Sequence, residues 1–186
     1  MGKLNTLCVH CTDTPASMTV SKAILEQWHK GPRDNAGGSV NYLGKKYNSR
    51  VDLPQETQGG IDIKKLKGRG WDRLGYSDLI HRNGAIENLT PYNEDNIVQA
   101  NEMTWGASGI NSNSRHIVLE GGWKSKGERA GIFNPYDIYT SEQLKALKSY
   151  IIKFKQQHPE AKVIGHNEVS GKTCPNFDVQ SFLTKL

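Results

Sequence analysis

The stretch Leu4-Asn-Thr-Leu-Cys-Val-His-Cys11 is a β-patterned run near the start of this 186-residue chain. Its residues alternate as in a β-strand, which places Leu7, Val9 and Cys11 on one face and Cys8 and His10 on the other. His10 therefore stands near the end of an apolar strand, where the functional sites of sheet proteins gather.

Further strands and helices are predicted along the chain. Residues 79–87 contain Asn83-Gly84 between apolar runs, which is typical of a β-hairpin. Two more strands are expected at 115–122, ending in a glycine turn, and at 161–164.

Helices are expected between these strands. A short helix over 21–30 is stopped by Gly31-Pro32, and a last one from Asp178 would bury Phe182 and Leu183. The capping box Thr140–Gln143 opens an amphipathic helix. Its inward residues are Leu144, Leu147, Ile151 and Phe154.

Strands interleaved with helices predict an α/β fold, a single domain of residues 1–186 with a mixed central β-sheet and helices packed on its faces. Residues 31–70 show no sustained period and are rich in Gly, Asn, Lys and Arg. We interpret them as a surface insertion, with a hairpin as one option, and not as a linker between domains.

Composition and charge narrow the class of protein. The apolar and charged fractions, 35% and 23%, are those of a globular domain, and no apolar run approaches the roughly 18 residues of a membrane span. No signal peptide is visible, so we expect synthesis in the cytoplasm. The net charge of +5 suits an acidic partner such as nucleic acid, a membrane surface or an anionic wall polymer, or is simply a solvated basic surface.

The stretch His166-Asn-Glu-Val-Ser-Gly-Lys-Thr-Cys174 carries an imidazole, a lysine and a thiol, and it follows a predicted strand. Imidazole and thiolate are ligands that zinc prefers, and His10 is the best candidate to join them. The other histidines, at positions 29, 81, 116 and 158, default to structural or surface roles. Cys8 and Cys11 point to opposite faces of a strand, which disfavours a metal shared between them.

Several motifs together carry a resemblance to a known family. They are Val9-His-Cys-Thr-Asp-Thr14, Gln27-Trp-His-Lys30, Gly75-Tyr76, His166-x-Glu-Val169 and Lys172-Thr-Cys-Pro-x-Phe-Asp178. In order and spacing they resemble the phage-lysozyme type of zinc amidase, the type 2 N-acetylmuramoyl-L-alanine amidases, which share a fold with peptidoglycan recognition proteins. Any one motif alone would be weak.

The resemblance implies a Zn²⁺ cofactor bound by His10, His166 and Cys174, with Tyr76 and Lys172 completing the catalytic site. It implies hydrolysis of the amide between the lactyl group of N-acetylmuramic acid and L-alanine in peptidoglycan. Three protein ligands leave zinc one open position, as catalytic zinc requires. Lys172 and Tyr76 would stabilise the carbonyl oxygen as it becomes negative.

Each role has an alternative. Tyr76 could be a half-buried strand aromatic, Lys172 a surface lysine, and Cys8 could replace Cys174 as the sulfur ligand, although the family places that sulfur in its C-terminal motif. Glu168 could orient His166 or only cap its loop. The family often has His-Phe or His-Tyr after the tyrosine, whereas Ser77-Asp78 stands here, so a substrate contact made by that histidine is not carried over.

The expected partner is a peptidoglycan muropeptide, with no nucleic acid or membrane partner, and the expected state is a monomer acting on the wall after release or export. The alternatives are a non-catalytic peptidoglycan-binding module and a basic nucleic-acid-binding protein. The sulfur ligand, which non-catalytic relatives usually lose, favours the enzyme. The dispersed Lys and Arg residues disfavour nucleic acid. The insertion 31–70, just before Tyr76, would wall the substrate groove, with its basic residues meeting peptide carboxylates.

Overall fold

The computed structural model describes residues 1–184 and divides into two units. The first unit contains Met1–Val20 and Tyr76–Leu186, of which the last two residues lie outside the described part. The second unit is Ser21–Gly75. It contains the predicted insertion 31–70 and also the preceding helix. The description of the whole chain as one domain stays a prediction.

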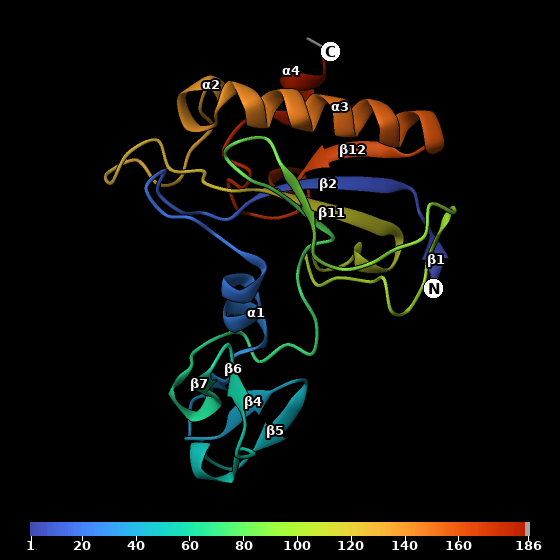
Figure 1. Cartoon of the computed structure of the whole chain (residues 1–186). Helices are drawn as coiled ribbons and strands as arrows, with labels where there is room; N and C mark the ends of the chain where they lie inside the picture. The colour runs from blue at the N-terminus through green and yellow to red at the C-terminus, as the bar shows by residue number, and fades with distance from the viewer. Residues whose placement is uncertain (185–186) are drawn as a thin grey trace. The chain divides into compact units, whose positions relative to one another are not determined.

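A five-stranded sheet forms the centre of the first unit, in the order β12-β2-β11-β8-β9. β2 runs parallel to both of its neighbours, and only the outer pair β8–β9 is antiparallel. The strands are β2 (Thr6–Cys11), β8 (Asp78–Ile80), β9 (Ile86–Asn88), β11 (Ser114–Leu119) and β12 (Lys162–Gly165). The sheet confirms the predicted mixed α/β fold class (Figure 1).

β2 and β11 are buried along all six of their residues, as expected for central parallel strands covered on both faces. The predicted alternation of β2 is confirmed, because Leu7, Val9 and Cys11 belong to the main hydrophobic core. The hairpin at Asn83-Gly84 is also confirmed. Gly84 has a φ of 83°, which a β-turn of this kind demands and glycine adopts without strain.

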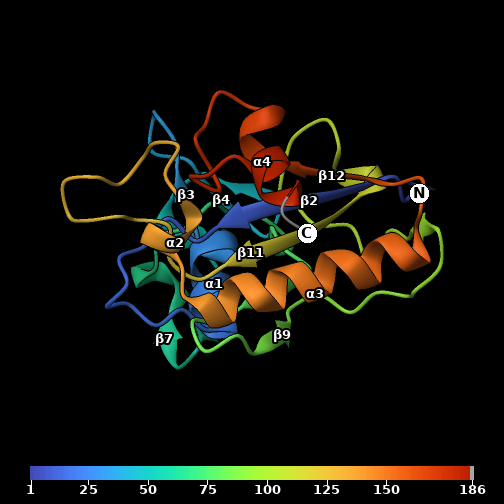
Figure 2. The same cartoon turned by 90° about the horizontal axis from the view of Figure 1, so that it is seen from above.

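Helix α3 (Ser141–Gln157) covers one face of this sheet, and α4 (Val179–Leu183) lies on the same side (Figures 1 and 2). Thr140 and Gln143 form the predicted capping box. The four predicted inward residues of α3 are all buried in the core. Asp178 caps α4, which buries Phe182 and partly buries Leu183. A short helix α2 (Pro135–Ile138) precedes α3.

The remaining elements of the first unit are short. β1 (Gly2–Lys3) pairs with β10 (Ile97–Val98), and the 3-10 turns are η3 (Asn111–Asn113) and η4 (His166–Glu168). None of the helices within residues 1–184 is long and apolar enough to cross a membrane.

The second unit starts with α1 (Lys22–Lys30), which confirms the short helix expected over 21–30, and Ser21 caps its first turn. The segment that lacks a period folds into two small sheets, one of three strands and one of two. The elements are β3 (Arg33–Asp34), β4 (Val40–Tyr42), β5 (Lys45–Tyr47), η1 (Arg50–Asp52), β6 (Thr57–Gln58), β7 (Ile61–Asp62) and η2 (Ile63–Lys65). Val40, Tyr42, Leu53 and Ile63 form a separate small core.

Candidate metal centre

The first unit brings three predicted ligands together at the carboxyl ends of neighbouring parallel strands. β12 pairs with β2 so that Gly165 lies beside Val9, which puts the following His166 next to His10. The ring centroids of His10 and His166 are 4.6 Å apart. Cys174 Sγ lies 3.8 Å from His10 Nδ1. One ligand atom from each of the three residues lies within 4.8 Å of the others, so the cluster could hold a metal ion.

The loop that carries Cys174 is fixed by its own hydrogen bonds. Asn167 N–H donates to the Cys174 carbonyl at 2.7 Å, and the Ser170 hydroxyl donates to the His166 carbonyl at 2.9 Å. The Glu168 carboxylate accepts from Gly165 N–H at 2.6 Å. Glu168 thus caps the turn that follows β12, which was one of its two predicted roles.

Asn176 ties this loop to the rest of the unit. Its side-chain amide donates to the carbonyls of Gly122 and Arg129 at 2.9 and 3.0 Å, and accepts from the Thr173 hydroxyl at 2.6 Å. Asn176 is buried and has a φ of 69°. It therefore secures the backbone two residues after Cys174.

Burial keeps His166 in the form that binds metal. Burial, and after it the positive charge of Lys172, lowers the pKa of His166 to about 4. Metal ligation requires a neutral imidazole, so His166 offers a free lone pair at neutral pH. Cys11 is fully inside the core, and its hydrogen bond to Cys174 together with burial raises the pKa of its thiol. Cys11 is a buried thiol, as its strand position predicts.

Tyr76 and Lys172 differ in how closely they approach the cluster. The Tyr76 ring lies 5.1 Å from the His10 ring, at an interplanar angle of 51°. Lys172 is exposed, on the loop between His166 and Cys174, and its charge acts on His166. The Tyr76 ring thus contacts the candidate centre directly, whereas Lys172 is an exposed residue of the loop between His166 and Cys174.

His116 is a neighbour of the centre that the sequence pattern does not predict. His116 Nδ1 lies 2.9 Å from His10 Nε2, and both residues are buried. Cys8, His10 and His116 form a second group whose ligand atoms lie within 4.8 Å of one another. Burial raises the pKa of the Cys8 thiol to about 12, so this sulfur stays protonated. The two groups share His10.

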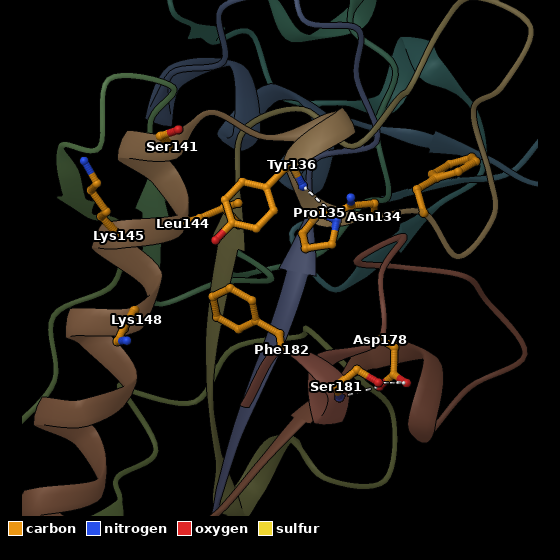
Figure 3. A pocket seen from close by; sticks show the side chains of 11 residues that line it. Asn134, Pro135, Tyr136, Ser141, Leu144, Lys145, Lys148, Asp178, Ser181 and Phe182 are labelled. Carbon is orange, nitrogen blue, oxygen red and sulfur yellow. Dashed lines mark hydrogen bonds between the residues drawn. The ribbon is translucent and has the colours of Figure 1, made fainter. Parts of the chain in front are cut away.

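A separate cavity of about 400 Å³ lies between α2, α3 and α4 (Figure 3). Leu144 and Phe182 provide apolar lining, and Lys145 and Lys148 project from α3 (Figure 3). None of the five predicted site residues lines it, so it is distinct from the candidate metal centre.

The sheet and the His–His–Cys cluster are compatible with a metal-dependent hydrolase, and comparison with known proteins assigns the class. A family model described as N-acetylmuramoyl-L-alanine amidase matches residues 2–177. The chain belongs to this family, and it is an enzyme that hydrolyses the bond between N-acetylmuramic acid and L-alanine in peptidoglycan. The non-catalytic alternative is thereby set aside.

Individual relatives agree with the family. The endolysin of Klebsiella phage KP32 is 27% identical over 177 residues, which cover 95% of this chain and 83% of that protein. The endolysin of Escherichia phage T7 is 30% identical over 135 residues, or 71% and 79% of the two chains.

Solved structures share the fold. The Ph2119 endolysin from a Thermus scotoductus bacteriophage matches with a TM-score of 0.60 at 17% identity, covering 100% of this chain and 86% of that one. The amidase LysC from Clostridium intestinale matches with a TM-score of 0.58 at 16% identity, covering 98% and 85%.

Proposed function

We propose that this amidase is zinc-dependent and that His10, His166 and Cys174 are the zinc ligands. The observation that carries the proposal is the convergence within 4.8 Å of His10, from a strand near the start of the sequence, with His166 and Cys174, from one stretch near its end. Three protein ligands are the number that catalytic zinc sites use, and nitrogen and sulfur are donors that zinc prefers.

The spacing of the donors fits zinc. Zinc bonds of about 2.0–2.1 Å to nitrogen and 2.3 Å to sulfur, at a tetrahedral angle, separate the two donors by about 3.6 Å. The distance between Cys174 Sγ and His10 Nδ1 is 3.8 Å. No rearrangement of the strands is needed for these side chains to share one ion.

The residues of the chain then have separable roles. Zinc, when bound, supplies a Lewis acid and lowers the pKa of water toward neutrality. The Lys172 ammonium and the Tyr76 hydroxyl would donate to the scissile carbonyl oxygen as it gains negative charge, and one such donor is commonly worth about 10²–10³ in rate. Tyr76 would also hand a proton to the leaving amine of L-alanine.

We further propose that the enzyme is a wall-lytic protein that acts as a monomer after release or export, with no nucleic acid or membrane partner. The endolysins among its relatives support this role. The substrate is then the lactyl-alanine amide of intact wall rather than a soluble fragment.

Metal content and product analysis test the proposal together. We expect about one zinc per purified chain, loss of peptidoglycan hydrolysis on chelation, and recovery on adding zinc. Cys174→Ser should lose metal and activity together, while Cys8→Ser should keep both. Mass spectrometry should find free N-terminal L-alanine in the digest; cleavage of another bond, or full activity of metal-free protein, would contradict the proposal.

The second unit carries the positive charge of the molecule. Residues 21–75 contain 11 Lys and Arg against 6 Asp and Glu, a net charge of +5, which equals that of the whole chain. The exposed basic residues include Lys45, Lys46, Lys65 and Lys67. We propose that this unit binds anionic groups of the wall polymer, such as stem-peptide carboxylates, and so raises the affinity of the enzyme for its substrate.

Charge variants of equal net charge test this proposal. Changing Lys45, Lys46, Lys65 and Lys67 to Gln should weaken retention on purified cell walls at low salt. The matched control changes four exposed lysines of the first unit, at positions 3, 126, 153 and 162, and should bind as wild type does. Equal losses in the two variants would show that total charge, and not the second unit, determines binding.

A further inference from the structure

The imidazole of His10 lies between two partners. Its Nδ1 atom faces Cys174 Sγ at 3.8 Å, and its Nε2 atom lies 2.9 Å from His116 Nδ1. His10 and His116 are 1% and 0% exposed, so solvent does not compete for this contact. The side of the ring away from the candidate metal centre is thus occupied by a second imidazole.

The parallel register of β2 and β11 builds this contact. His116 lies opposite Cys8, and Val118 lies opposite His10. His116 is therefore diagonal to His10 on the same face of the sheet. Ser77 holds the His116 backbone from the other side, since Ser77 N–H donates to the His116 carbonyl at 2.8 Å. The position of His116 is fixed by three adjacent strands or strand ends.

We propose that His116 is a positioning residue for the metal ligand His10: its Nδ1 accepts the proton of His10 Nε2–H and so directs the lone pair of His10 Nδ1 toward the metal. This inference rests on the proposed function, in which His10 is a zinc ligand. A neutral imidazole carries one proton, and a proton held on Nε2 leaves Nδ1 free to coordinate. Metal-ligating histidines generally donate their second N–H to an acceptor such as a carboxylate, a backbone carbonyl or water, and here a second imidazole takes that place.

The same geometry argues against a second metal between Cys8, His10 and His116. A separation of 2.9 Å between the two nitrogens is a direct hydrogen bond. A second ion would further require His10 to give up both of its ring protons. Cys8 therefore serves as a small buried side chain beside the histidine pair.

Three substitutions at position 116 separate the hydrogen bond from packing. His116→Leu removes the acceptor. His116→Asn places an amide near the position of Nδ1, whereas His116→Gln places it farther out, near Nε2. We expect the zinc affinity, measured by competition with a chromophoric chelator, to fall about 10–100-fold in Leu and Gln and to stay within a few-fold of wild type in Asn. The absorption spectrum of the cobalt-substituted protein should change in the same order.

The outcomes are decisive even where one variant fails to fold, because the Asn and Gln variants differ only in where the amide lies. Unchanged zinc affinity in Gln or Leu, with wild-type zinc bound normally, would overturn the inference and leave the proposed function intact. Wild-type protein that binds no zinc would overturn both. Two zinc ions per wild-type chain, falling to one in Cys8→Ser, would overturn the inference in favour of a second metal.

Discussion

Asn176 offers a direct test of how the fold secures Cys174, the proposed sulfur ligand. Its side chain makes three hydrogen bonds, to the carbonyls of Gly122 and Arg129 and from the Thr173 hydroxyl. At about 1 kcal/mol net for each bond, Asn176→Ala loses about 3 kcal/mol of the free energy of unfolding. The left-handed backbone, with a φ of 69°, adds about 1–2 kcal/mol for alanine, which lacks the polar side chain that lets asparagine adopt this conformation.

We therefore expect Asn176→Ala to destabilise the metal-free protein by about 4–5 kcal/mol. Asn176→Gly loses the same hydrogen bonds but adopts the backbone freely. Because glycine is also more flexible in the unfolded chain, the glycine variant should be only about 1 kcal/mol more stable than the alanine variant. Both should bind zinc more weakly, since the loop carrying Cys174 is less well held.

Urea denaturation with chelator present, followed by circular dichroism, measures the stability, and chelator competition measures the zinc affinity. The exposed Asn101 supplies a control, because Asn101→Ala should shift stability by less than about 0.5 kcal/mol. Alanine and glycine variants of equal stability would refute the backbone argument. A loss below about 1 kcal/mol in both would refute the assignment of the hydrogen bonds.

Three further predictions concern catalysis, acid stability and the buried carboxylate of Glu120. Lys172→Met should bind zinc as wild type does and lower kcat about 10²–10³-fold, whereas an unchanged kcat would rule out a role in stabilising the carbonyl oxygen. His29 accepts from Gly75 N–H, and burial, with Arg69 and Lys30 after it, lowers its pKa to about 4. Because the unfolded pKa is about 6.5, the stability that His29 contributes above pH 6.5 is lost as the pH falls toward 4. Between pH 7 and pH 5 the free energy of unfolding, measured by urea denaturation, should therefore fall by about 2 kcal/mol less in His29→Asn than in wild type. Parallel losses in the two proteins would contradict this. Glu120 accepts from the N–H groups of Val20 and Arg82 at 2.7 and 3.0 Å. Glu120→Ala should therefore lower the free energy of unfolding, measured by urea denaturation, by about 3–6 kcal/mol, whereas the exposed control Glu128→Ala should lower it by less than about 0.5 kcal/mol. Similar losses in the two variants would refute this prediction.

The elements predicted best from sequence are those whose local signals agree with their burial. In α3, the capping box at Thr140 and the spacing of the inward residues indicate the same helix. β2 alternates and is also apolar, and it lies inside the sheet between β12 and β11. The two-residue strands β1 and β10 have no detectable pattern, because two residues cannot show a period. They depend on pairing with each other.

The second unit shows where a pattern fails although a structure exists. Its apolar residues are isolated in the sequence, yet Val40, Tyr42, Leu53 and Ile63 meet in one small core. Short strands joined by glycine turns bring them together, and no single stretch is long enough to reveal a period. An insertion could be predicted there, but its sheets and its inclusion of α1 could not.

The candidate metal centre could likewise be predicted only in part from the sequence. His10, His166, Cys174, Tyr76 and Lys172 could be proposed because they lie in motifs that resemble a family. The contact of His116 with His10 could not, because it depends on the register between β2 and β11, which a single sequence does not reveal. The structural or surface role predicted for His116 did not include a contact with His10.

The position of β2 explains why one histidine can serve both contacts. Its neighbour β12 delivers His166 to one side of His10, and its neighbour β11 delivers His116 to the other. A shift of either pairing by one residue would turn its histidine to the opposite face, where Leu7 and Val9 pack into the core. The buried apolar residues that set the register are therefore also what places the two ring nitrogens of His10 against different partners. The same pairing of these three strands stabilises the sheet and sets the geometry of the site. A substitution that disturbs the pairing of β2 with β11 or β12 should therefore weaken metal binding before it unfolds the protein.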